Sequence, residues 1–258
     1  MKKLIIGILV MILGVSLLGG METAYAVQPT HTPNPAVTAN RLAKAKSAAR
    51  KLVTKRENDL KKVREHLKKF KGTTLESDYA EMEGLLNKMQ EMLTAWKTAI
   101  NAATTVDDVK SVSKTAVQKT RYYLVFRPDF MLLIKVMVMN RSYAQIQKRI
   151  QTYETELSGK FNNSKNTAYE DAVKKLAEIK EKASGIPGSL ATLKSSIYAL
   201  TPDLANSNRS EFNKKLTEVR TNVNTTKAKI NTIFANLKQL KALLDKIRNN
   251  TPTPAAST

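Results

Sequence analysis

The feature that most constrains the fold is a stretch near the C-terminus in which apolar residues recur at alternating spacings of four and three. Its members are Phe212, Leu216, Val219, Val223, Thr226, Ile230, Ile233, Leu237, Leu240, Leu244 and Ile247. Thr226 is the one polar residue among them. This spacing places the whole set along one side of an α-helix, as in the a and d positions of a coiled coil. The pattern predicts a helix over about 209–248, roughly 60 Å long, with Ser210 as its N-cap.

The same periodicity recurs in three earlier parts of the chain. The clearest of them, with Ser77 as a candidate N-cap, consists of Tyr79, Met82, Leu86, Met89, Leu93, Trp96 and Ile100. Another consists of Leu132, Val136, Met139, Tyr143, Ile146, Ile150, Tyr153 and Leu157. The earliest of the three in the chain consists of Leu42, Ala45, Ala49, Leu52, Val53, Leu60, Val63, Leu67 and Phe70. We expect this helix to end at Gly72 and Thr73-Thr74. Short links place consecutive helices antiparallel. We therefore predict an all-α fold, an elongated antiparallel helical bundle with long coiled-coil-like helices.

Two further segments follow the helical period and are limited by turn residues. Thr105-Val-Asp-Asp108 resembles a capping box and begins a helix expected to reach about Phe126. Pro128 is then expected to break or kink the chain and to exclude Arg127 from the helical conformation. Gly185-Ile-Pro-Gly188 is expected to stop or bend a helix marked by Tyr169, Val173, Leu176 and Ala183. The apolar spacing resumes beyond it at Ile186, Leu190, Leu193, Ile197 and Leu200.

The N-terminus has the three-part pattern of a secretory signal peptide over residues 1–26. Met1-Lys2-Lys3 is a short basic start, an apolar run extends from Leu4 to Gly20, and Ala24-Tyr25-Ala26 is a small-x-small cleavage site. We expect cleavage after Ala26 and a secreted or cell-envelope location. The alternative is a retained N-terminal membrane anchor, for which the apolar run is at the short edge of what spans a bilayer.

Composition marks the ends of the predicted folded part. Residues 27–38 and 249–258 are rich in proline and threonine and poor in large apolar residues, so we expect a disordered spacer and a disordered tail. Between them we predict an N-terminal helical unit over 39–158 and a C-terminal helical unit over 165–248. The chain has no cysteine, so helix packing must stabilise it without disulfides.

The titratable residues show no pattern that indicates catalysis, a metal site or a cofactor. His31 lies in the predicted spacer, and His66 lies in the basic first helix with no second histidine or cysteine nearby in the sequence. The acids Glu76, Asp78, Glu81 and Glu83 cluster where a helix is expected to begin, and acids there favour the positive end of the helix dipole. We therefore predict a non-enzymatic protein without a cofactor.

Charge is the remaining functional signal, because the chain has a formal net charge of +21. Residues 41–71 hold 13 basic and 3 acidic residues, 75–108 hold 2 basic and 7 acidic, and 209–248 hold 10 basic and 3 acidic. The densest cluster, our candidate anion-binding site, is Lys61, Lys62, Arg64, Lys68 and Lys69. The alternative is a solvated face, or charge paired internally with the acidic 75–108 segment.

These observations leave several functions open. One is a structural or interaction protein that binds a protein partner or forms a homo-oligomer. Either would use the apolar helix face formed by the periodic residues from Phe212 to Ile247, which we call the 212–247 seam. Another is non-specific binding of an anionic polymer or surface, such as teichoic acid, anionic lipid or extracellular DNA. A membrane-active role is also compatible with amphipathic helices. Lysines outnumber arginines 32 to 11 and few aromatics interleave with them, so we expect no specific nucleic-acid recognition.

Two short stretches carry a resemblance to a known family. They are residues 106–112 with 121–128, which read VDDVKSV and RYYLVFRP, and residues 199–203, which read ALTPD. With the frame of Arg121, Tyr123 and Pro128, the chain resembles a family of uncharacterised exported helical-bundle proteins from Gram-positive and candidate-phylum bacteria. The resemblance implies export and a helical architecture, and it carries over no functional residue.

Overall fold

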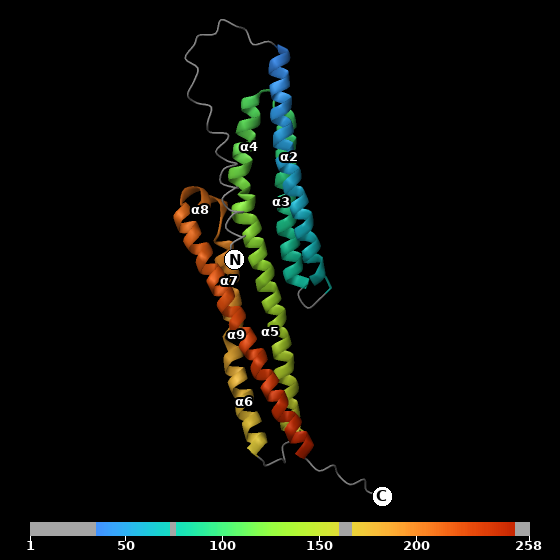
Figure 1. Cartoon of the computed structure of the whole chain (residues 1–258), viewed down its shortest axis with the longest axis vertical. Coiled ribbons are helices and arrows are strands. Elements are labelled where there is room, and N and C mark those ends of the chain that lie inside the picture. The colour runs from blue at the N-terminus through green and yellow to red at the C-terminus, as the bar shows by residue number, and fades with distance from the viewer. Residues whose placement is uncertain (1–34, 73–75, 160–166, 251–258) are drawn as a thin grey trace, which may run out of the picture. The chain divides into compact units, whose positions relative to one another are not determined.

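The computed structural model describes residues 35–72, 76–159 and 167–250, and in these ranges the regular structure is helical, with no strand (Figure 1). The helices are α2 (Pro35–Leu67), α3 (Glu76–Ala102), α4 (Val106–Thr120), α5 (Arg127–Gly159), α6 (Thr167–Ser184), α7 (Ile186–Tyr198), α8 (Pro202–Ser207) and α9 (Arg209–Asn250). A 3-10 turn, η1 (Lys68–Phe70), follows α2, and a π-helix, η2 (Tyr122–Phe126), joins α4 to α5. The predicted all-α helical bundle is confirmed.

Contacts divide the chain into residues 1–41 and 42–258, and the packing below is that of the second unit. The predicted signal peptide over 1–26 lies outside the described residues, as do positions 27–34 of the predicted spacer and 251–258 of the predicted tail. Pro35 already begins α2, a position that suits the fixed φ of proline. Within the described ranges, no helix has an apolar stretch long enough to cross a membrane.

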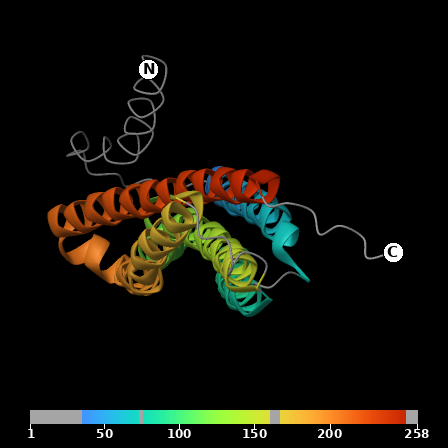
Figure 2. The same cartoon turned by 90° about the horizontal axis from the view of Figure 1, so that it is seen from below.

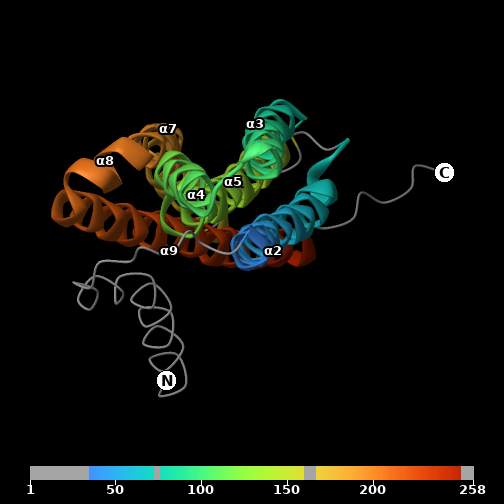
Figure 3. The ribbon, with the colours of Figure 1, turned by 90° about the horizontal axis from the view of Figure 1, so that it is seen from above.

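One part of the core lies between α9 and the helices α5, α6 and α7, which it packs against (Figures 1 and 2). All eleven members of the predicted 212–247 seam are buried, with Leu216 the most exposed at 8%. The seam is therefore covered within a single chain, and a homo-oligomer that used it would first have to unpack α9. The six-residue helix α8 connects α7 to α9 and packs on α9 (Figure 3).

The directions of these helices follow from side-chain contacts along them. The Arg149 guanidinium lies 5.6 Å from the centroid of the Phe234 ring, and further along both helices Arg248 binds Glu156. Because both contacts advance together in sequence, α5 and α9 are parallel. In the chain, α6 and α7 follow α5 and precede α9, and they run antiparallel to both (Figure 1). The contacts of α5 with α6, α7 and α9 thus cross the boundary predicted between residues 158 and 165.

α2 and α3 form an antiparallel pair. Lys46 of α2 reaches Asn101 of α3, while Arg64 reaches Glu83, so positions ascend on one helix and descend on the other. The α3 seam is buried from Met82 to Ile100.

Two predicted core residues prove to be exposed. Leu52 in α2 is 49% exposed because its neighbour Val53 occupies the buried position. Val173 in α6 is 44% exposed for the same reason, with Ala172 buried in its place. Adjacent residues in a helix differ by about 100° around its axis, so only one of each pair can face the core.

The helix starts follow side-chain capping chemistry. The predicted capping box is confirmed, since the Thr105 hydroxyl accepts from the Asp108 backbone N–H at 3.0 Å and Asp108 accepts from the Thr105 backbone N–H at 2.8 Å. This second hydrogen bond holds the pKa of Asp108 below its ordinary value. The predicted cap at Ser210 is wrong, because Asn208 accepts from the Glu211 backbone N–H and α9 begins at Arg209.

The start of α3 also differs from the prediction. Ser77 lies inside the first turn of α3, which begins at Glu76, so it is not the cap of this helix. Before α3, Gly72 adopts a φ of +71°, a conformation that favours glycine, and its N–H donates to Glu76 at 2.6 Å. The predicted end of the first helix at this glycine is confirmed, with η1 as its last turn.

The break in the middle of the chain lies at Arg121 rather than at Pro128. α4 ends at Thr120, and Arg121 takes a left-handed conformation with φ 35° and ψ 42°. Arg127 is helical, with φ −65° and ψ −46°, so the expected exclusion of Arg127 from a helix is wrong. Pro128 lies in the first turn of α5, where a missing N–H and a fixed φ are tolerated. The predicted break at Gly185 is confirmed, because α6 ends at Ser184 and α7 begins at Ile186.

Candidate anion-binding surface

The five predicted cations lie at the C-terminal end of α2 and in η1, and the structure separates them into paired and unpaired groups. Arg64 is half-buried, with Nε 2.9 Å from a Glu83 oxygen, and Nη2 donates to Asn87 at 2.7 Å. Its charge is therefore neutralised by α3. Lys68 donates to Glu65 at 2.8 Å on the exposed side of the same segment, an ion pair that raises the pKa of Lys68 and lowers that of Glu65.

Lys61, Lys62 and Lys69 are exposed and form no hydrogen bond or ion pair with any described residue. The cluster predicted from local density is therefore reduced to three available ammonium groups. The reason is geometric, because residues close in sequence point in different directions around a helix, and α3 covers one of those directions.

Other cations of α2 also contact residues of α3. Lys46 Nζ donates to the Asn101 carbonyl at 2.8 Å, and Arg50 Nε donates to its side-chain oxygen at 2.8 Å. Arg56 is only 7% exposed, and its guanidinium lies 4.6 Å from the centroid of the Trp96 ring. Burial lowers the pKa of Arg56 below its ordinary value. These three contacts stabilise the α2–α3 pair. Of the three cations only Arg56 is buried, because Arg50 remains exposed and lines a groove beside Lys51 and Lys55.

The opposite side of α2 carries a set of lysines that sequence density did not reveal. Lys44, Lys51, Lys55, Lys62 and Lys69 are separated by 7, 4, 7 and 7 residues, and all are exposed. At about 100° per residue the first four lie within roughly 20° on either side of one direction, which is opposite that of Val53 and Leu60. We call these five residues the α2 lysine stripe. The sequence does contain a signal for the stripe. Its lysines recur mostly every seven residues, at positions that fall between the apolar residues of the same helix.

The surface along the stripe is a shallow groove with small polar side chains between the cations. Its lining includes Ser47, Thr54, Asn58 and the single acid Asp59. Asp59 is occupied, because it accepts a hydrogen bond from Tyr123 of η2 at 2.9 Å. Burial and this hydrogen bond raise the pKa of Tyr123 to about 12. The ring of Tyr123 lies 5.8 Å from Lys55 Nζ, which places an aromatic face beside the stripe.

A second basic surface lies between α5 and α9. Arg127 and Lys135 of α5 and Arg220 of α9 line one groove together with Met131 and Asn224. These three cations are exposed and form no ion pair within the described part of the chain.

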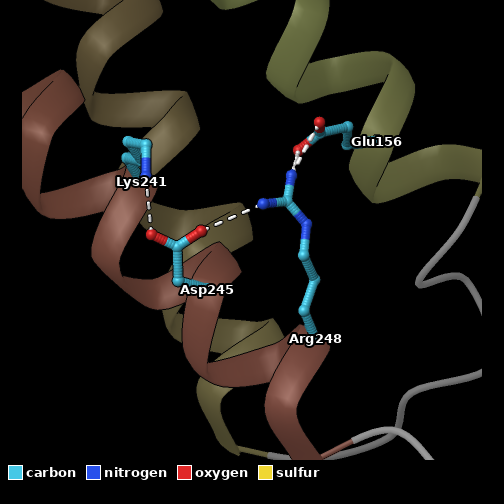
Figure 4. Close-up of polar contacts among 4 residues, drawn as sticks. All are labelled: Glu156, Lys241, Asp245 and Arg248. Carbon is cyan, nitrogen blue, oxygen red and sulfur yellow. Dashed lines mark hydrogen bonds and ion pairs between the residues drawn. The ribbon is translucent and has the colours of Figure 1, made fainter.

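Further along α9 the basic residues are paired. Arg248 makes two contacts of 2.8 Å to Glu156 of α5 and one of 3.0 Å to Asp245, and Lys241 also donates to Asp245 at 2.7 Å (Figure 4). Part of the positive charge in the last turns of α9 is therefore neutralised by ion pairs with Glu156 of α5 and with Asp245.

The acids at the start of α3 form a brace between helices that sequence reasoning missed. Lys194 of α7 lies 2.5 Å from Glu81, whose other oxygen accepts from the Tyr198 hydroxyl, and Asn140 of α5 donates to Asp78 at 3.1 Å. Burial raises the pKa of Glu81, but the hydrogen bonds from Lys194 and Tyr198 outweigh it and leave the pKa below its ordinary value. No sequence signal joins residues more than 110 positions apart.

No group of three or more metal-ligating side chains comes together in the described ranges. His66 is exposed on α2, and His31 lies outside these ranges.

No protein-family model matches the chain, and neither a functionally described protein nor a solved structure is similar to it. The resemblance of residues 106–128 and 199–203 to an exported family therefore stays a prediction.

Proposed function

We propose that this chain is an exported, non-enzymatic helical protein with an interaction role in the cell envelope, where it binds an anionic polymer through the α2 lysine stripe. The observation that supports the proposal is the sorting of cations on α2. Those that face α3 are ion-paired, hydrogen-bonded or buried, whereas the stripe is exposed along about 27 Å of helix between Lys44 and Lys62.

The chemistry of the stripe favours a repeating anion over a single small one. Its ammonium groups are spread along a line instead of converging on one point, so a linear polyanion can contact several of them at once. Lysine binds phosphate and sulfate as a point charge without the two-pronged geometry of arginine. Binding should therefore depend on charge density and little on polymer sequence. The groove with Arg127, Lys135 and Arg220 extends the positive potential to α5 and α9.

The test compares two variants with equal loss of charge. In the first, Lys44, Lys51, Lys55 and Lys62 are changed to glutamine. In the control, four exposed lysines of α9 are changed in the same way, namely Lys214, Lys227, Lys238 and Lys246. Retention on immobilised teichoic acid and on heparin is measured between 50 and about 300 mM salt, with helical content checked by circular dichroism.

We expect the stripe variant to lose most of its retention and the control to keep it. For four phosphate contacts, the logarithm of the wild-type binding constant should fall with the logarithm of salt concentration with a slope of about −3. Equal losses in both variants would mean that net charge alone governs binding. Retention of the stripe variant at the wild-type level would contradict the proposal.

A further inference from the structure

A pocket with a different chemistry lies on the inner side of the π-helix. It has a volume of about 240 Å³ and is bounded by α3, the end of α4, η2, the start of α5, the end of α7 and the start of α8 with the link before it. Its walls are largely carbon and include Met89, Phe126, Phe130, Leu133 and Ile197. Met92 of α3, which is 37% exposed, lies at its rim. Such a space is small, apolar and open to entry from solvent.

One carboxyl group, that of Asp129, belongs to the wall of this pocket. Its Oδ1 is buried and has no hydrogen-bond partner among the described residues, and Asp129 forms no ion pair there. Buried polar atoms in folded proteins are nearly always hydrogen-bonded, so an orphan oxygen in a pocket wall indicates a missing donor. Burial raises the pKa of Asp129 to about 8.

The charged and titratable groups around Asp129 do not supply that donor. Lys119 of α4 lines the pocket, yet its ammonium lies outside ion-pair distance of Asp129. Tyr198 of α7 also lines it, but its hydroxyl already donates to Glu81. The lining residues from α3 and η2 are apolar.

The backbone explains why the pocket is next to Asp129. Arg121 turns left-handed, and the wider π-turn of η2 follows it, so Val125 and Phe126 form one wall immediately before α5 begins. π-turns are found frequently at functional sites because they displace side chains from regular helical positions. Asp129 is in the first turn of α5, directly after this irregularity.

We propose that this pocket binds a small ligand that carries a primary ammonium group on an apolar chain, with the ammonium donating to the Asp129 carboxylate and the chain lying against Phe126, Phe130 and Met89. An ammonium supplies both the missing donor and the opposite charge, aromatic rings attract cations, and a flexible methionine adapts to an apolar chain. The inference is independent of polymer binding by α2, which involves a different surface and the opposite ligand charge.

Hexylammonium is a suitable probe, and hexan-1-ol is its neutral counterpart of similar length. Isothermal titration of the full protein at pH 9 should give about tenfold to a hundredfold tighter binding of hexylammonium than of hexanol, the difference that a charge-assisted hydrogen bond supplies. Hexylammonium affinity should fall as the pH is lowered from 9 to 6, because the carboxyl becomes protonated, while hexanol affinity should stay constant.

Two variants and a control locate the site. Asp129→Asn should bind hexylammonium no more tightly than hexanol, whereas Asp171→Asn, at an exposed carboxyl of α6, should behave as wild type. Met92→Lys places an internal ammonium at the rim and should abolish hexylammonium binding through competition. If hexanol binds wild type as tightly as hexylammonium, or if hexylammonium binds with the same affinity to Asp129→Asn or Met92→Lys, the proposal is wrong. Because the alcohol comparison and the pH series need only wild-type protein, an unfolded variant does not remove the test.

Discussion

Replacement of Asp129 by asparagine should stabilise the protein, and the gain should grow with pH. The ordinary pKa of an aspartate is 3.8, and burial raises that of Asp129 to about 8. The unfolded chain therefore releases this proton from about pH 4, while the folded chain retains it until about pH 8. Because the unfolded state binds fewer protons in that window, the free energy of unfolding falls as the pH rises.

The size of the effect follows from the same two values. Each pKa unit is worth about 1.4 kcal/mol, so the change from 3.8 to about 8 sets a ceiling of about 5 kcal/mol at pH 8. Asp129 is only half-buried as a residue, and part of the penalty is relieved by solvent. We therefore expect Asp129→Asn to gain about 2–4 kcal/mol relative to wild type between pH 4 and pH 8.

Urea denaturation followed by circular dichroism at 222 nm, at pH 5, 6, 7 and 8, measures this difference. Carboxyls with a lowered pKa, such as Glu81 and Asp108, have the opposite pH dependence, but they are present in both proteins and cancel in the comparison. Asp171→Asn provides the baseline for loss of an exposed carboxyl. A difference between wild type and Asp129→Asn that stays constant from pH 5 to pH 8 would refute the assignment of Asp129 as a desolvated carboxyl.

Two further substitutions, each with a control, test the bundle itself by the same denaturation measurement. Leu237→Ala removes a fully buried seam residue and should lower the free energy of unfolding by about 2–5 kcal/mol, whereas Leu52→Ala, at a residue 49% exposed, should change it by less than about 0.5 kcal/mol. Thr105→Ala removes half of the capping box and should cost about 1 kcal/mol. Thr115→Ala, at an exposed position within the same helix, should be neutral or slightly stabilising; equal losses at positions 105 and 115 would argue against the cap.

The parts of the fold that were predictable are those in which local chemistry and packing agree. The 212–247 seam is continuous over eleven positions. A wrong assignment of any single position would therefore not have changed the predicted helix or its buried face. The Thr105 capping box is a local motif that needs only residues 104–108. The glycine breaks at Gly72 and Gly185 depend equally on nearby residues.

The failures have the opposite origin. Pro128 was expected to break a helix because the rule for the residue before proline is local. The chain had already turned at Arg121, and a new helical segment begins at Tyr122 as η2 and continues into α5 at Arg127. Arg64 was included among the available cations because its pairing with Glu83 depends on how α3 lies against α2. Asp129 and its pocket are invisible in the sequence, since the lining residues come from six separate elements.

The burial of the α9 seam also has a consequence for the order of folding. The apolar faces of α5, α6 and α7 precede their common partner in the chain, and α9 is the last helix in the described residues. A growing chain can pair α2 with α3 early, but it cannot close the core around α5 until Arg209–Asn250 has been synthesised. Folding of this half is thereby postponed until α9 has been synthesised, and the apolar faces of α5, α6 and α7 stay without their common partner until then.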